Sequence, residues 1–169
     1  VGCPCPDGKY SKNQEYALAA DTIHEVGHNW FPMIVATDER KWTWMDEGIN
    51  SFLQFLTEQE WEDNYPSRRG EPRNVVEYML DPNQEPIMTN SESVKQLGNN
   101  AYLKPATALN ILRETVMGRE LFDLTEVALA RASNLLDQKM AQLFRHLLHR
   151  VGWNLRIAGG QGHWLSCSC

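Results

Sequence analysis

His24-Glu25-Val26-Gly27-His28 is the stretch that decides how this sequence folds. It ends a segment, residues 16–28, that is rich in helix formers and carries an apolar stripe at Leu18, Ile23 and Val26. This pattern predicts a helix that runs to about Trp30 and is stopped by Pro32. Ser11 or Asn13 is a suitable cap for its first turn.

The spacing inside this stretch is that of a metal chelate. Residues four apart on a helix lie on one face, so His24 and His28 can direct ring nitrogens at one tetrahedral metal. Glu25 lies about 100° around the helix from His24, where it can reach a water rather than the metal, as a general base must. A catalytic zinc takes three protein ligands and leaves one position open. Glu47, within Trp44-Met45-Asp46-Glu47-Gly48, is the candidate for the third ligand of one Zn²⁺ per chain.

The residues after His28 narrow the class of zinc site. A metzincin would need Gly at position 31 and His or Asp at position 34, where this chain has Phe31 and Ile34. A gluzincin arrangement, in which a distant glutamate completes the ligands, remains open.

Further helices follow from apolar spacing and from Gly and Pro positions. Residues 47–61 are predicted to form a second helix capped by Asp46, with Glu47 in its first turn. A short element at 75–80 lies between loops at 64–74 and 81–93. Another helix is expected just after Tyr102, with Pro105 near its start and Gly118 at its end.

Composition limits the function classes. The chain has 169 residues, of which 42% are hydrophobic and 22% charged, as in one globular domain. A net charge of −6 argues against nucleic acid as a partner. No run of 18 apolar residues occurs, so we expect no membrane insertion. The N-terminus lacks the pattern of a secretory signal. Compartment and oligomeric state are not indicated.

The last third differs in charge, because residues 124–169 hold only two of the 22 acidic side chains but five of the 16 basic ones. We therefore divide the chain into a catalytic part, 1–123, and a divergent part, 124–169, with an amphipathic helix at about 135–151 and a disordered tail. Cys3, Cys5, Cys167 and Cys169 lack the Cys-x-x-Cys spacing of structural zinc sites. We interpret them as free thiols rather than as a second metal site or disulfides.

Several other polar side chains have two possible interpretations, one as part of a functional site and one as ordinary surface residues. Asp38 and Glu39 could orient a ligand imidazole, but solvated side chains are the favoured reading. The same holds for the arginines of the 64–74 loop, which could hold a peptide carboxylate. The acidic run from 58 to 63 is read as an exposed helix end. His146 and His149 have chelating spacing but no third ligand, and are read as surface residues.

Three motifs, in this order, resemble the gluzincin aminopeptidases, the family of aminopeptidase N and leukotriene hydrolase. They are His24-Glu25-x-x-His28 followed by Glu47, the setting Trp44-Met45-Asp46-Glu47-Gly48, and Tyr102-Leu-Lys104-Pro-Ala. The family has Trp-Leu-Asn-Glu-Gly for the second and Tyr-x-Lys for the third. The resemblance covers residues 14–123.

The resemblance implies a mainly α, thermolysin-like zinc peptidase lobe that hydrolyses peptide bonds. His24, His28 and Glu47 would bind zinc, Glu25 would activate water, and Tyr102 would donate a hydrogen bond to the oxyanion. A rival reading is a zinc-binding but inactive module. A third is a structural helical domain in which the two histidines are neighbours by chance.

The chain also departs from that family. The family's Gly-x-Met-Glu-Asn motif, which lies upstream of the zinc helix and binds the substrate's amino terminus, is absent from residues 1–23. This leaves open whether the activity would be exo- or endopeptidase. We expect the chain to be a fragment of a larger enzyme, with its substrate side-chain preference undetermined.

Overall fold

The computed structural model describes residues 10–131, and the side chains of residues 10–125. This part of the chain is mainly helical and contains no β-strand, which confirms the mainly α class. No helix in it is both long and apolar enough to span a bilayer. The predicted helix at 135–151, His146, His149 and the four cysteines lie outside the described residues.

Within this range, α-helices alternate with wider π-helical turns. In chain order the elements are α1 (Lys12–Gly27), η1 (Asn29–Ile34), η2 (Trp44–Gly48), α2 (Ile49–Trp61), α3 (Pro72–Leu80), η3 (Gly98–Leu103), α4 (Lys104–Ile111), η4 (Leu112–Met117) and α5 (Arg119–Arg131). α5 therefore runs through the boundary that the sequence suggested after residue 123.

The first helix begins where the sequence predicts. Ser11 caps it, because its hydroxyl accepts a hydrogen bond from the Gln14 backbone N–H while the Gln14 side chain accepts from the Ser11 N–H, a capping box. The α-helix ends at Gly27, three residues earlier than expected, and the chain enters η1. The apolar stripe is not its buried face: Leu18 and Val26 are 42% and 51% exposed, and His24 is the residue that α1 buries.

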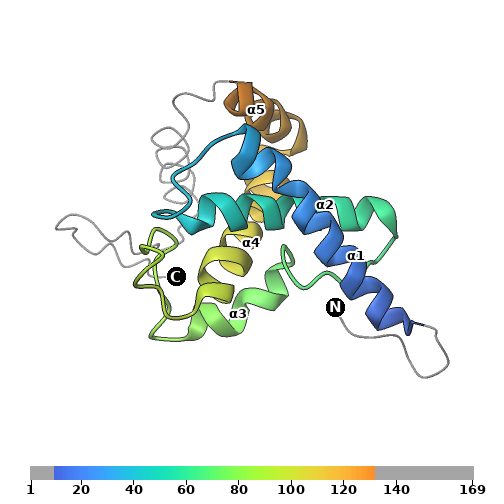
Figure 1. Ribbon diagram of the computed structural model, residues 1–169, viewed down its shortest axis with the longest axis horizontal. Coiled ribbons are helices and arrows are strands. Elements are labelled where there is room, and N and C mark those ends of the chain that lie inside the picture. The colour runs from blue at the N-terminus through green and yellow to red at the C-terminus, as the bar shows by residue number, and fades with distance from the viewer. Residues whose placement is uncertain (1–9, 132–169) are drawn as a thin grey trace.

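α2 is the central helix and packs against α1 and α4 (Figure 1). The prediction that Asp46 caps it is wrong, because the backbone is already helical at Thr43 and continues through η2 into α2. Trp44 and Met45 are each only 1% exposed. The earlier helical start directs both into the core, and it leaves the Asp46 side chain available for other contacts.

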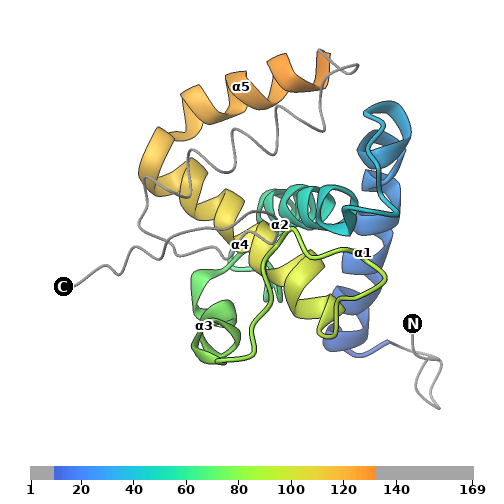
Figure 2. The same ribbon diagram turned by 90° about the vertical axis from the view of Figure 1, so that its left-hand side faces the viewer.

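The hydrophobic core lies between η2, α2 and α4. Its most deeply buried members are Trp44, Met45, Ile49, Phe52, Ala106 and Leu109. Phe122, near the start of α5, packs edge-on against Phe52 with ring centroids 5.5 Å apart. This contact holds α5 on the opposite side of α2 from α3 (Figure 2).

The helix expected after Tyr102 also begins early. η3 precedes α4, so Tyr102 lies inside a helical turn rather than ahead of it. The turn is held by Asn100, whose buried amide donates to the carbonyls of Glu85 and Pro86 at 3.0 and 2.8 Å. This bond pair ties η3 to the long loop before it and sets the direction of Tyr102.

Candidate metal centre

The three side chains predicted as ligands meet at one point. Nε2 of His24 lies 3.0 Å from Oε2 of Glu47, and Nε2 of His28 lies 3.4 Å from the same oxygen. Each residue offers one ligand atom within 4.8 Å of the others. α1 supplies both histidines and η2 supplies Glu47, so two helical segments far apart in sequence build what we call the ligand cluster.

A chain of side-chain hydrogen bonds fixes the ring of His24. The Gln54 Nε2 donates to Oε1 of Glu58 at 2.6 Å, so the other end of that amide, Oε1, must face His24. This oxygen lies 2.9 Å from Nδ1 of His24 and can only accept. Nδ1 therefore carries the proton, and in the neutral ring the lone pair is on Nε2, which faces Glu47.

His28 is oriented in the same sense by different partners. Its Nδ1 lies 2.8 Å from the Phe31 carbonyl oxygen, again a pure acceptor, and 3.0 Å from Oδ1 of Asp46. The proton of the neutral ring is therefore on Nδ1, and Nε2 again faces Glu47. The turn η1 matters here because it directs the Phe31 carbonyl back toward the helix end.

The donor set fits a divalent metal such as zinc. Two imidazole lone pairs and a carboxylate oxygen face one another, which is unfavourable unless protons or a cation lie between them. A tetrahedral ion bound at about 2.0–2.1 Å separates its ligand atoms by roughly 3.3 Å. The distances of 3.0 and 3.4 Å match that separation. Outer partners on each Nδ1 are also typical of zinc-binding histidines.

Gly27 allows α1 to approach α2 at this point. A Cβ at Gly27 would lie 2.0 Å from Oδ1 of Asn50, which is fully buried. The same Asn50 donates from Nδ2 to the His24 carbonyl at 2.8 Å. The glycine between the two histidines is thus required by helix packing.

Gly48 serves the same purpose on the other side. A Cβ there would lie 2.5 Å from Pro105 and 2.9 Å from the Ala101 carbonyl oxygen. η3 and α4 therefore pack directly on η2, and Tyr102 comes next to Glu47.

Tyr102 stacks on the ring of His24, with centroids 5.9 Å apart and planes at 27°. Burial, together with a hydrogen bond to the Glu47 carboxylate, raises the pKa of Tyr102 well above its usual value. The hydroxyl is therefore a donor across the physiological pH range. The guanidinium of Arg69 covers this ring at 4.3 Å from its centroid.

The carboxylates of the site are shifted in opposite directions. Burial opposes the charge of Glu47, but hydrogen bonds and the charge of the imidazoles outweigh it and lower the pKa of Glu47. The hydrogen bonds come from Tyr102 and from Nε2 of His24, which donates only in the metal-free site when both of its ring nitrogens are protonated. Burial, and then the charge of Glu47, raise the pKa of Asp46 to about 6, although His28 opposes this.

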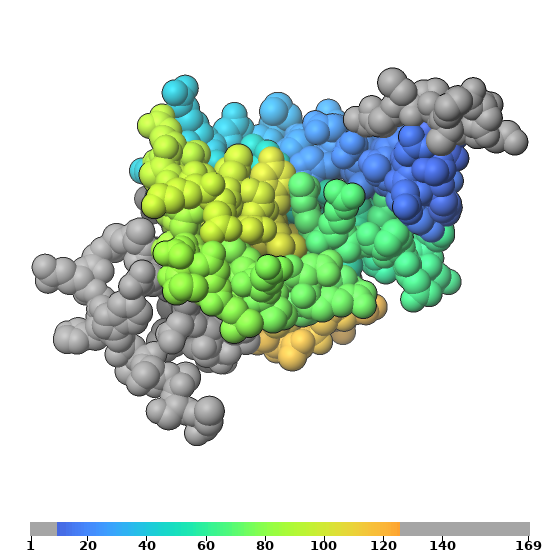
Figure 3. Space-filling view, turned by 90° about the horizontal axis from the view of Figure 1, so that it is seen from below, coloured from blue at the N-terminus to red at the C-terminus, as the bar shows by residue number. Residues whose placement is uncertain are grey.

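The ligand cluster opens into a cavity of about 670 Å³. Glu25 and Tyr102 line this cavity together with all three predicted ligands, as do Arg68 and Arg69 from the loop after α2. Figure 3 shows α1, in blue, along one edge of the molecule, next to the green segment that follows α2. Glu25 is exposed, so its carboxylate is accessible to water.

Sequence reasoning missed the partners of the two rings. Asp38 and Glu39 are exposed, and Gln54 and Asp46 contact the imidazoles instead. A signal for Gln54 existed, since it lies seven positions after Glu47 and therefore on the same helix face.

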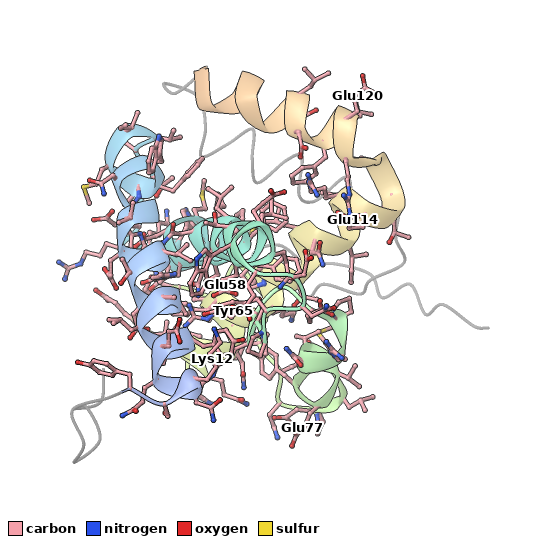
Figure 4. All side chains as sticks on the ribbon, turned by 90° about the vertical axis from the view of Figure 1, so that its right-hand side faces the viewer. Lys12, Glu58, Tyr65, Glu77, Glu114 and Glu120 are labelled. Carbon is pink, nitrogen blue, oxygen red and sulfur yellow. The ribbon has the colours of Figure 1, made fainter. Side chains whose placement is uncertain are left out.

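The reading of residues 58–63 as an exposed acidic run is wrong for Glu58, which is 2% exposed. Figure 4 shows Glu58 close to Tyr65, in the interior beside α1. It accepts hydrogen bonds from Gln54 and Ser67. Glu62 is engaged too, with Lys12 and Tyr16 at 3.1 and 2.6 Å.

No family model, no curated protein and no solved structure significantly matches this chain.

Proposed function

We propose that this chain is a zinc-dependent peptidase domain of the gluzincin type, with a thermolysin-like helical lobe and an aminopeptidase-like activity on peptides. The observation that carries the proposal is the ligand cluster: two imidazole lone pairs and one carboxylate oxygen converge at 3.0 and 3.4 Å on the wall of a cavity. The motif order and the position of Tyr102 beside the cluster support it.

His24, His28 and Glu47 would hold the ion. Zinc supplies Lewis acidity, which polarises a scissile carbonyl and lowers the pKa of a water toward ~7. Glu25, one residue after a ligand and exposed to the cavity, accepts the proton of the attacking water and passes it to the leaving amine. Tyr102 is protonated, and its single O–H would turn from Glu47 to donate a hydrogen bond to the oxygen on which negative charge develops.

The roles of the surrounding residues follow from their contacts. Gln54 and the Phe31 carbonyl keep each Nδ1 protonated and so present Nε2 to the ion. Arg69 stacks on the Tyr102 ring and restricts its movement.

The test compares the chain with its Glu25→Gln variant. The protein is loaded with one equivalent of zinc, bound zinc is measured by elemental analysis, and hydrolysis is followed on aminoacyl amides and short peptides. We expect about one zinc in both proteins and a fall in turnover of roughly 10²–10⁴-fold in the variant, the usual loss for a general base.

Three outcomes are informative. Near-normal turnover in Glu25→Gln would show that the base is assigned wrongly. Bound zinc without turnover in either protein would favour a zinc-binding but inactive module. Failure to bind zinc would mean that the three ligands are neighbours by packing alone.

A further inference from the structure

Arg69 is a cation of this cavity to which the proposed mechanism gives only the role of holding Tyr102. It lies in the loop between α2 and α3, lines the cavity, and stacks on Tyr102 with its central carbon 4.3 Å from the ring centroid. The same ring also stacks on His24, so Arg69 is one ring away from the ligand cluster.

The guanidinium of Arg69 has donors to spare. It carries five N–H groups, and its hydrogen bonds go to two neutral oxygens at long distance, Oγ of Ser51 at 3.3 Å and Oε1 of Gln54 at 3.4 Å. Among the side chains of residues 10–125, no carboxylate oxygen lies within 4.0 Å of it. Arg113 shows the contrast, since it binds Asp123 at 2.7 Å and Glu114 at 2.8 Å.

A partly buried guanidinium without a carboxylate partner is costly to a fold unless something else offsets its desolvation. Its planar fork matches a carboxylate, which can accept two parallel N–H bonds. Burial lowers the pKa of Arg69, but the side chain stays charged at neutral pH. The cavity side of Arg69 therefore suits an anionic planar group on a ligand.

We propose that Arg69 binds the C-terminal carboxylate of a short peptide substrate, which makes di- and tripeptides with a free carboxyl end the preferred substrate class. The inference rests on the proposed peptidase function. Arg69 and Glu47 both contact Tyr102, so they are separated by roughly 10 Å at most, the span of about three extended residues. The carboxylate must therefore lie within two or three residues of the scissile bond.

The experiment compares two substrates that differ in one group. Leucyl-glycine and leucyl-glycinamide are assayed with the zinc-loaded chain, with Arg69→Gln and with the matched control Arg73→Gln. Arg73 lies outside the cavity and its side chain is 81% exposed. We expect the unchanged chain to prefer the free acid at least tenfold in kcat/KM.

In Arg69→Gln, kcat/KM for the acid should fall about 10–100-fold further than kcat/KM for the amide, the effect of losing a charge-assisted pair. Any additional fall that the two substrates share reflects the contact of Arg69 with Tyr102. Arg73→Gln should match the unchanged chain on both. An equal fall on both substrates would mean that Arg69 acts only by holding Tyr102, and would overturn the proposal. So would an unaltered preference for the acid.

Binding separates this inference from the proposed function. Calorimetry with a phosphinic dipeptide analogue and its carboxamide gives the same acid-to-amide comparison without turnover. A preference for the acid that disappears in Arg69→Gln, in a chain that hydrolyses neither peptide, would support the carboxylate site and refute the peptidase. Hydrolysis without any effect of Arg69→Gln on the acid-to-amide ratio of Kd would refute the carboxylate site alone.

Discussion

Tyr102 and Lys104 are two positions apart, yet they belong to different polar regions. Tyr102 contacts the ligand cluster. Lys104, only 2% exposed, donates to Oε1 of Gln84 and to the Glu85 carbonyl, both at 2.8 Å. We call Lys104 with these two partners the lysine cluster.

The two clusters differ in how their polar atoms are arranged. In the lysine cluster a donor meets acceptors, and none of its residues lines the cavity. In the ligand cluster three acceptors face one another beside open space. A buried charged side chain such as Lys104 therefore does not by itself indicate a metal site. Three lone pairs that converge beside a cavity are the stronger indication of one. Changes in the first cluster should alter stability, and changes in the second should alter zinc affinity.

The largest effect is expected from His28→Ala. Two of three ligands remain, and the Kd for zinc should rise by at least roughly 10³-fold, a modest share of the binding free energy of such sites. Competition with a chelating dye measures it. Lys104→Met is the control and should still bind one zinc. Loss of zinc in both variants would erase the distinction between the clusters.

Lys104 should make stability rise with alkaline pH. Burial lowers its pKa to about 8 from 10.5. Below pH 8 both states are protonated and the burial cost is fully present. Between pH 8 and 10.5 the folded state releases its proton first, so the unfolded state binds more protons and stability increases.

Relative to Lys104→Met, the free energy of unfolding should therefore gain roughly 3 kcal/mol across that window. Denaturant titrations of both proteins from pH 7 to 10 provide the difference. If the difference in unfolding free energy between the two proteins stays constant or falls as the pH rises, Lys104 does not carry a desolvated ammonium group in the folded state.

Gln54→Leu should weaken zinc binding without removing a ligand. His24 loses the acceptor for its Nδ1 proton, and losses of this kind cost about 10–100-fold in metal affinity. Gln59→Leu is the matched control, since Gln59 lies on the same helix but donates to the Tyr65 carbonyl and to Ser67. Equal zinc Kd values for the two variants would show that the Gln54 contact does not tune the ligand.

Ser11→Ala should have the smallest effect and provides the baseline. It removes the cap of α1 and should cost about 1 kcal/mol of stability. Ser11 touches neither cluster, so the zinc Kd should be unchanged within twofold. A larger shift in the zinc Kd would mean that fraying of α1 extends to the two histidines. The measured zinc affinity would then depend on the stability of α1 as well as on the ligands.

The residues of the ligand cluster could be proposed from the sequence because the chelate is local. Two histidines one helical turn apart have a fixed relation in any helix. Glu47 and Tyr102 came from the resemblance of their motifs and from the order of these motifs, since no helical periodicity in their own segments indicates that they meet His24.

What the sequence could not provide depends on long-range packing. Glu47 and Tyr102 both lie in π-helical turns, a type frequent at functional sites but without a sequence pattern of its own. Glu58 has the surface composition of an acidic run, and its contact with Ser67, in the loop after α2, is not encoded in the pattern of its own helix. The helix starts were misplaced for the same reason: Trp44 and Asn100 are drawn into the interior by contacts beyond their own segments.

The contact of Asn50 with Gly27 has a consequence for the history of such sequences. Any side chain at position 27 collides with the amide 2.0 Å away, so one of the spacer positions between the two histidines is not free to vary. Among descendants of this chain, replacement of Gly27 should be found only together with a smaller residue at position 50. Paired change at these two positions would record the closeness of the helices without any structure being determined.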